Sequence, residues 1–368
     1  MSRLSCRAHS PCPAHALTHP APPGPCAHYE KRATRRESAQ FRRRVDQNSS
    51  GSHSQRSSST GRVRAENPTD RAFVLPRTAL ASDSGQMDLC RFGHLARTRD
   101  LIGHGLSRRA IARIARDPAV RTVRRGLFAC AHLEPDQRAA AESGARLDCV
   151  SVLRRHGIWA GHDRRLHLRL PPNRARPKSG SVFHYSPLRA SAELLEVSVV
   201  DALTQAMRCL EPDDVVASLE SAVYLKQITL DQLDALILRA PRRLQAVLTE
   251  LEIGAQSGVE THVRLRLRRS GYRVCAQQFV PGVGRLDNVV EDCVAVETDG
   301  STYHLETFEA DHWRDLGTEW LRIRVLRIHP DLVFNHWGLV KATVDRMVAD
   351  AQFVRSRGGA RRRGERSQ

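Results

Sequence analysis

Apolar residues recur with a regular spacing only after residue 86 of this chain. Residues 1–86 are rich in Pro, Ser, Arg and His, and their few apolar positions follow no period. Such a segment buries too little apolar surface to offset the conformational entropy that folding removes, so we expect it to be disordered. The abrupt change of composition at Met87 makes this residue a candidate for the true start of translation.

Residues 87–131 have the pattern of a small winged helix-turn-helix. A first helix is predicted over residues 94–104, and Ser107 is a suitable N-cap for a second helix over residues 108–116. Residues 120–128 then alternate as a strand, a tight turn and a second strand, which would form the wing.

This predicted module carries arginines on its second helix and on its wing. A recognition helix with Arg near its N-terminus can reach base edges, while wing arginines can contact phosphates. The alternative is a small structural module whose arginines form a solvated face. The residues expected to contact DNA are Ser107, Arg108, Arg109, Arg113, Arg124 and Arg125.

Residues 132–250 are expected to be mostly helical, with short strands, and to act as a connector or interaction region. The predicted helices cover residues 139–156, 197–210, 212–224 and 230–240, and residues 166–170 alternate as a strand. No group of residues in this region indicates a reaction. Its histidines are expected to be packed or at the surface; they are His156, His162, His167 and His184.

The residues that indicate chemistry lie in the last third of the chain. Asp287 and Glu297 stand ten positions apart, and short apolar runs flank a turn at residues 291–292. A β-hairpin of that length brings the two carboxylates to one end of a sheet. Carboxylates held close together repel each other unless a cation lies between them, so the arrangement suits Mg²⁺, which can activate water for phosphodiester hydrolysis.

Roughly residues 255–350 resemble the PD-(D/E)XK nuclease superfamily, and within it the bacterial family related to very-short-patch-repair endonucleases. The resemblance rests on an ordered series of segments. They are residues 257–272 (a first helix with an acidic residue), 277–287 (a strand leading to Asp), 297–304 (E-x-D-G-x-x-x-H), 308–315 (a helix) and 320–328 (a last strand). The resemblance implies a restriction-endonuclease-like α/β core with a mixed sheet.

The resemblance also implies roles for individual residues. Asp287 and Glu297 would bind Mg²⁺, or Mn²⁺ in its place, with the carbonyl of Thr298 as a further ligand. Glu260, Asp299 and His304 would orient water, hold a second ion or transfer protons, and the sequence leaves these roles open. The superfamily's Lys is replaced by Asp299, as in the close family, and Asn288 stands where an apolar residue is usual.

The N-terminal module is similar to that of AbiEi-type antitoxins, which are DNA-binding repressors. The shared residues are 105–107, 110–111 and 124–128. The sequence therefore supports a metal-dependent DNA endonuclease with its own DNA-binding module. The alternative is an AbiEi-like regulator whose nuclease fold is not catalytic, and a third interpretation is an RNA nuclease. The expected partners are DNA and a toxin or other protein bound through the middle region.

Charge adds less to this picture than the net value of +18 suggests. Residues 1–86 carry a net charge of +8 and residues 355–368 carry +5, which leaves +5 for the body of the chain. The basic ends therefore account for most of the excess, and the case for nucleic-acid binding depends on the placement of individual arginines.

The nine cysteines form no C-x-x-C pair, which indicates reduced thiols and a cytoplasmic chain. No apolar run approaches the roughly 18–20 residues of a membrane span, so we expect no membrane partner. Taken together, the chain is predicted to be an α/β multidomain protein. Its expected units are residues 1–86 (disordered tail), 87–131 (winged helix-turn-helix), 132–250 (middle region), 255–350 (nuclease-like domain) and 351–368 (basic disordered tail).

Overall fold

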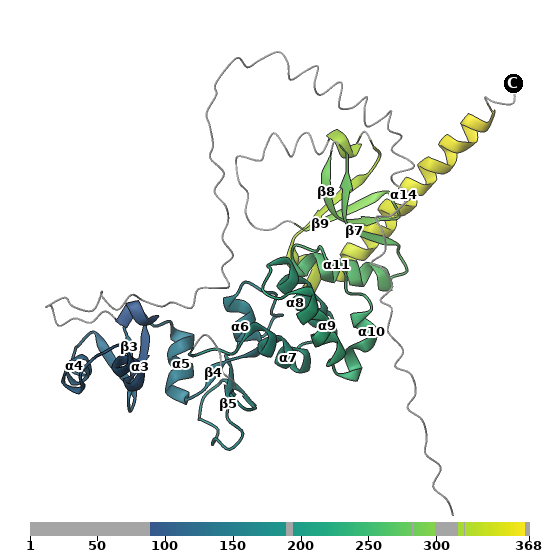
Figure 1. The fold of residues 1–368 in the computed structure, drawn as a ribbon. Helices are drawn as coiled ribbons and strands as arrows, with labels where there is room; N and C mark the ends of the chain where they lie inside the picture. Colours follow the sequence, from purple (N-terminus) through teal and green to yellow (C-terminus); the bar gives the residue numbers. More distant parts are fainter. Residues whose placement is uncertain (1–88, 189–193, 282, 299–315, 320, 365–368) are drawn as a thin grey trace, which may run out of the picture.

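The computed structural model describes residues 89–188, 194–281, 283–298, 316–319 and 321–364. These residues form a mixed α/β structure with three separate sheets. A small N-terminal module is followed by a helical middle region, and a four-stranded sheet with helices lies at the C-terminal end (Figure 1). Among the described residues, no helix combines the length and the apolar character needed to cross a membrane.

The N-terminal module (residues 89–132) is built on an antiparallel sheet in the order β1-β3-β2. Its elements are η3 (Leu89–Phe92), β1 (Leu95–Arg97), α3 (Thr98–Gly103), α4 (Arg108–Ile114), β2 (Val120–Arg124) and β3 (Leu127–Cys130). The Ser107 hydroxyl accepts a hydrogen bond from the Ala110 N–H, which confirms the predicted N-cap. Gly126, with φ +73°, makes the predicted turn between β2 and β3.

The helix predicted over residues 94–104 was wrong in its first half. Residues 95–97 form the strand β1, and only residues 98–103 are helical. Leu95 pairs with Ala129 of β3, so the sheet satisfies the backbone groups that a helix would otherwise have to satisfy. This pairing joins distant segments, and local periodicity carries no signal for it.

The middle region contains a second small sheet in the order β4-β5-β6, covered by helices. Its elements are α5 (Pro135–Ser143), β4 (Arg146–Leu147), α6 (Cys149–Arg155), β5 (His167–Leu170), β6 (Val182–Tyr185), α7 (Val199–Cys209), α8 (Pro212–Tyr224), α9 (Leu230–Leu238), η4 (Arg242–Leu244) and α10 (Gln245–Leu248). The helix predicted over residues 139–156 is two helices, because Gly144 at φ +68° ends α5 in the left-handed region and β4 follows.

The C-terminal region is a mixed sheet in the order β10-β9-β8-β7, in which only the β9–β10 pair is parallel. Its elements are α11 (Gly258–Arg269), β7 (Val274–Val280), β8 (Gly284–Val290), β9 (Val294–Thr298), β10 (Arg324–Ile328), α13 (Pro330–Asn335) and α14 (Trp337–Gly364). Glu291 and Asp292, at φ 49° and 55°, make the predicted hairpin turn between β8 and β9.

One face of this sheet packs against α11 and α14. Val263 of α11 and Val344 of α14 join Val290 and Val296 of the sheet in one buried apolar cluster. Helix α14 continues through residues 351–364, a segment for which we expected no regular structure. Arg and Ala are good helix formers, so a helix begun by packing can extend along this arginine-rich stretch.

Helix α11 is also fixed by the middle region, through contacts with α8. Arg264 is fully buried and its Nη2 lies 2.6 Å from Glu220 Oε1. His262 Nε2 lies 2.9 Å from Asp214 Oδ1, and the Trp159 indole N–H donates to the same oxygen at 2.8 Å. The position of α11 relative to the sheet therefore depends on the middle region as well as on the C-terminal core.

Candidate functional site

Four polar side chains form a row across the C-terminal sheet. The β7–β8 register pairs Ala276 with Asn288 and Gln278 with Leu286, so Gln277 stands opposite Asp287. The β8–β9 register pairs Asn288 with Val296, and continued by one residue it aligns Asp287 with Glu297. Glu297 pairs in turn with Arg327 of β10. The register therefore aligns one polar residue on each of the four strands. The row is Gln277, Asp287, Glu297 and Arg327.

A third carboxylate reaches this row from α11. Ser257 caps the helix by accepting from the Glu260 N–H at 3.2 Å, which places Glu260 in the first turn. Glu260 Oε2 accepts from the Gln256 N–H at 2.9 Å and from Gln277 Nε2 at 2.7 Å. Gln277 Nε2 also lies 3.4 Å from Asp287 Oδ1. One side-chain amide therefore links the helix carboxylate to the strand carboxylate.

The environment of Glu260 favours its neutral form. Burial raises the pKa of the Glu260 carboxyl, and the nearby negative charge of Asp287 raises it further. Hydrogen bonds from Gln256, Ser257 and Gln277 oppose this rise in pKa. Glu260 is thus a carboxyl group that takes up a proton more readily than an exposed glutamate does.

Asn288 occupies a position where we expected an apolar residue, and the structure shows what it does there. Its side chain is buried, and its amide Nδ2 donates to the backbone carbonyl of Glu260 at 3.3 Å. The residue therefore ties β8 to the first turn of α11, next to the carboxylate that the helix contributes.

The remaining predicted ligands lie at the end of the β8–β9 hairpin. Asp287 Oδ2 accepts from the Thr298 backbone N–H at 3.1 Å, and Glu297 Oε2 lies 3.7 Å from Arg327 Nε. Glu297 is buried, whereas Arg327 is partly exposed. Two further predicted site residues, Asp299 and His304, lie outside the described residues.

The carboxylates suit a hard divalent cation that keeps part of its hydration shell. In the described part of the chain, the groups of three or more His, Cys, Asp or Glu donors within 4.8 Å of one another consist of Cys and His alone. Glu260, Asp287 and Glu297 therefore do not form a closed set of ligands. Mg²⁺ is commonly held by one or two carboxylates together with waters and substrate phosphate, so it does not require a closed set of protein ligands.

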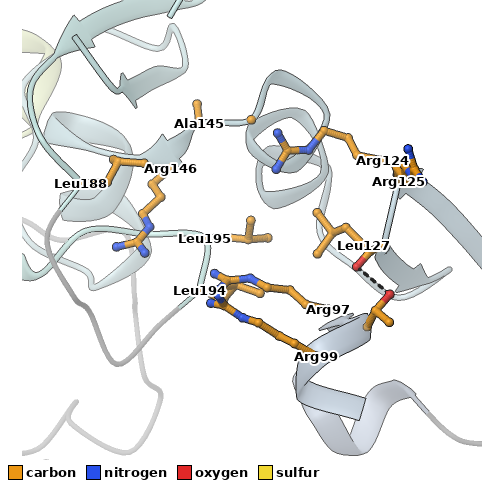
Figure 2. Close-up of a pocket in the computed structure, with 13 residues that line it drawn as sticks. Arg97, Arg99, Arg124, Arg125, Leu127, Ala145, Arg146, Leu188, Leu194 and Leu195 are labelled. Carbon is orange, nitrogen blue, oxygen red and sulfur yellow. Dashed lines mark hydrogen bonds between the residues drawn. The ribbon is translucent and has the colours of Figure 1, made fainter. Parts of the chain in front are cut away.

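A separate basic cavity of about 640 Å³ lies between the N-terminal module and the middle region (Figure 2). Arginines from both sides of it, together with leucines, line the cavity. The arginines are Arg97, Arg99, Arg124, Arg125 and Arg146. Cations gathered in a concave surface raise the local concentration of anions, so the cavity suits a phosphate-bearing ligand.

The structure divides the predicted DNA-contacting residues into two groups. Arg124 and Arg125 line the basic cavity. Arg108, Arg109 and Arg113 are exposed on α4 and do not line it. The hydroxyl of Ser107 is engaged as the N-cap of α4.

Sequence reasoning missed several of these residues. Arg97 and Arg146 reach the cavity from the ends of short strands, which no periodic pattern indicated. Gln277 was missed as well, although it stands opposite Asp287. Its backbone has φ 47°, a conformation that the pattern of apolar and polar residues does not predict. The pairing of Arg327 with Glu297 depends on the β9–β10 register, which the sequence pattern does not give.

No protein-family model matches this chain, and no curated protein matches it. The geometry of the described residues is therefore the basis of the proposals that follow.

Proposed function

We propose that this protein is a metal-dependent DNA endonuclease. The observation that carries the proposal is the register of the C-terminal sheet, which sets Asp287 opposite Glu297, with Glu260 of α11 linked to Asp287 through one amide. A Mg²⁺ or Mn²⁺ ion held by Asp287, Glu297 and the carbonyl of Thr298 would supply Lewis-acid stabilisation of the phosphate and an activated water.

The side chains around the carboxylates have separate tasks in this proposal. Gln277 holds Glu260 and Asp287 at a fixed separation by lying within hydrogen-bond reach of both. Burial and the charge of Asp287 raise the pKa of Glu260. In this proposal Glu260 accepts or releases a proton during hydrolysis. Arg327, partly exposed beside Glu297, offers a cation to the scissile phosphate. Asp299 and His304 are assigned to orienting water or transferring protons, as the family resemblance implies.

The arginines of the N-terminal half supply DNA binding in this proposal. The basic cavity attracts phosphate groups, and the exposed arginines of α4 extend the positive surface. Contacts of this kind to phosphates give affinity that falls steeply as salt is added.

Cleavage of plasmid DNA tests the proposal. The purified protein is incubated with supercoiled and linear DNA in Mg²⁺, in Mn²⁺ or in chelator, alongside Asp287→Ala and Glu297→Ala. The matched control is Asp350→Ala, because Asp350 is an exposed carboxylate on α14 that pairs only at the surface with Arg324. We expect cleavage that requires metal, is lost in both site variants and persists in the control. Cleavage that survives in chelator or in both site variants would contradict the proposal.

The basic cavity favours a second candidate function, a DNA-binding regulator whose C-terminal fold is not catalytic. Under this alternative the protein shifts DNA in a gel without cleaving it, and Asp287→Ala binds as the wild type does. Arg109→Ala and Arg124→Ala would then weaken binding. RNA oligonucleotides of matched sequence form a further arm of the same assay, because the carboxylates alone do not distinguish DNA from RNA.

A further inference from the structure

Two groups of Cys and His side chains converge outside the carboxylate site. In the middle region, the donor atoms of Cys149, His167, His184 and Cys209 all lie within 4.8 Å of one another. They come from four elements: Cys149 begins α6, His167 begins β5, His184 lies in β6 and Cys209 ends α7. His167 Nδ1 lies 3.1 Å from His184 Nε2, which lies 3.9 Å from Cys209 Sγ.

Outer polar groups orient the donors of this middle cluster. His167 Nε2, the nitrogen facing away from the cluster, lies 3.2 Å from Asp163 Oδ2. The side-chain amide of Gln205 donates to Cys209 Sγ at 3.4 Å. Metal-bound histidines almost always give their second nitrogen to a carboxylate, carbonyl or water, which fixes the ring and the tautomer. The Asp163–His167 contact has that arrangement.

The N-terminal module contains an independent cluster of the same composition. Cys90 Sγ lies 3.5 Å from Cys130 Sγ and 3.3 Å from His132 Nδ1. His94 Nδ1 lies 3.2 Å from Cys130 Sγ, which lies 3.9 Å from His132 Nδ1. Donors around a tetrahedral Zn²⁺ are separated by roughly 3.3–3.8 Å, as follows from the Zn–S and Zn–N bond lengths. The separations in both clusters fall close to this range.

Backbone conformation supports the same conclusion in each cluster. His94 has φ 71° and Cys149 has φ 49°, in the left-handed region that residues with a side chain rarely adopt. Strained conformations of this kind persist where the surroundings impose them, and they gather at functional sites. Thiols are weak hydrogen-bond donors, so hydrogen bonds among the four side chains alone would offset little of the energy of this strained backbone.

We propose that each cluster binds one Zn²⁺ ion in a structural Cys₂His₂ site. Two thiolates and two imidazoles are the donors that zinc prefers, whereas Mg²⁺ and Ca²⁺ require oxygen ligands. Four protein donors close the coordination sphere, which is the arrangement of structural rather than catalytic zinc. Binding displaces the proton of each thiol, so metal uptake at each site releases protons.

The two sites would join segments that are distant in the chain. The N-terminal site links η3 and the turn before β1 to the end of β3, and the middle site links α6 and the β5–β6 pair to the end of α7. The proposal is independent of the endonuclease assignment, because none of these ligands belongs to the carboxylate row.

Metal content of the full-length protein tests the proposal. Cys209→Ser and His132→Gln remove the exposed ligand of the middle and the N-terminal cluster, respectively. Cys293→Ser is the matched control, because Cys293 is a cysteine outside both clusters. We expect each ligand variant to bind one equivalent of zinc less than the wild type, the double variant two less, and the control the same amount. Equal zinc content in the wild type and both ligand variants would overturn the proposal.

Cobalt substitution of the wild-type protein gives a readout that does not depend on whether the variants fold. Replacing zinc with Co²⁺ in the wild type should give the intense visible bands of tetrahedral cobalt with thiolate ligands. Each ligand variant that keeps the wild-type circular dichroism should lose about half of that intensity. Wild-type protein without tetrahedral cobalt bands would overturn the proposal. So would a Cys90–Cys130 or Cys149–Cys209 disulfide in freshly purified protein.

Discussion

Gly258, at the start of α11, leaves space for an aromatic ring that fixes the helix. A Cβ atom added at Gly258 would lie 2.2 Å from Cδ2 of Trp159, which is far closer than real carbon atoms approach. Trp159 has little freedom to move aside, because its indole N–H donates to Asp214 and its ring stacks on Phe334. Gly258→Ala should therefore displace α11, and with it Glu260, which lies two residues further along.

The size of the effect follows from opposing contributions. Overpacking costs about 1–3 kcal/mol, and weakening the Trp159–Asp214 hydrogen bond costs about 1.5–3 kcal/mol. The higher helix propensity of alanine stabilises the helix by about 1 kcal/mol relative to glycine. We expect a net loss of about 1.5–5 kcal/mol, seen as a fall in Tm of several degrees or more, together with slower DNA cleavage.

The matched control for this prediction is Gly338→Ala in α14. A Cβ atom at Gly338 would meet no atom within 4 Å, so the substitution should leave Tm unchanged or raise it. Thermal unfolding followed by circular dichroism compares the two variants. Equal stability of Gly258→Ala and Gly338→Ala would refute the packing of Trp159 against α11.

Three further predictions concern charged side chains. The raised pKa of Glu260 means that ionising this residue destabilises the fold as pH rises above the ordinary carboxyl range. In chelator, Glu260→Gln should therefore raise Tm at pH 8, with no gain below about pH 4; a gain of equal size at both pH values would contradict this. Arg264→Met should cost about 3–5 kcal/mol in chemical denaturation, because it leaves Glu220 buried without its cation; a loss below about 1 kcal/mol would argue against a buried pair. Arg146→Ala should weaken DNA binding and reduce its dependence on salt by about one phosphate contact, measured by fluorescence anisotropy at several salt concentrations; an unchanged salt slope would exclude this contact.

Local patterns predicted the elements that are determined by neighbouring residues. The hairpin around Glu291 and the helix that begins at Pro212 were both confirmed, because turn residues and apolar spacing mark them within a short window. The strand β1 and the break at Gly144 were missed, since the first depends on pairing with β3 and the second on a left-handed conformation.

The same distinction applies to the candidate sites. The strands that carry Asp287 and Glu297 could be aligned from the sequence because a single hairpin joins them. The Cys and His clusters could not be predicted, because each set comes from segments that are distant in the chain. Sequence reasoning instead assigned His167 and His184 to packing or to the surface. The basic cavity could likewise not be predicted from the sequence, since its arginines belong to different parts of the chain.

The rate of DNA cleavage as a function of Mg²⁺ concentration tests the central claim most directly. Asp287→Asn and Glu297→Gln keep the shape of each side chain while removing its charge, so folding and DNA binding should be preserved. The account predicts that each change lowers the rate at saturating Mg²⁺ by about a hundredfold or more, and that more Mg²⁺ is needed to reach half of it. Wild-type rates in either variant, or no cleavage by the wild-type protein at any Mg²⁺ concentration, would contradict it.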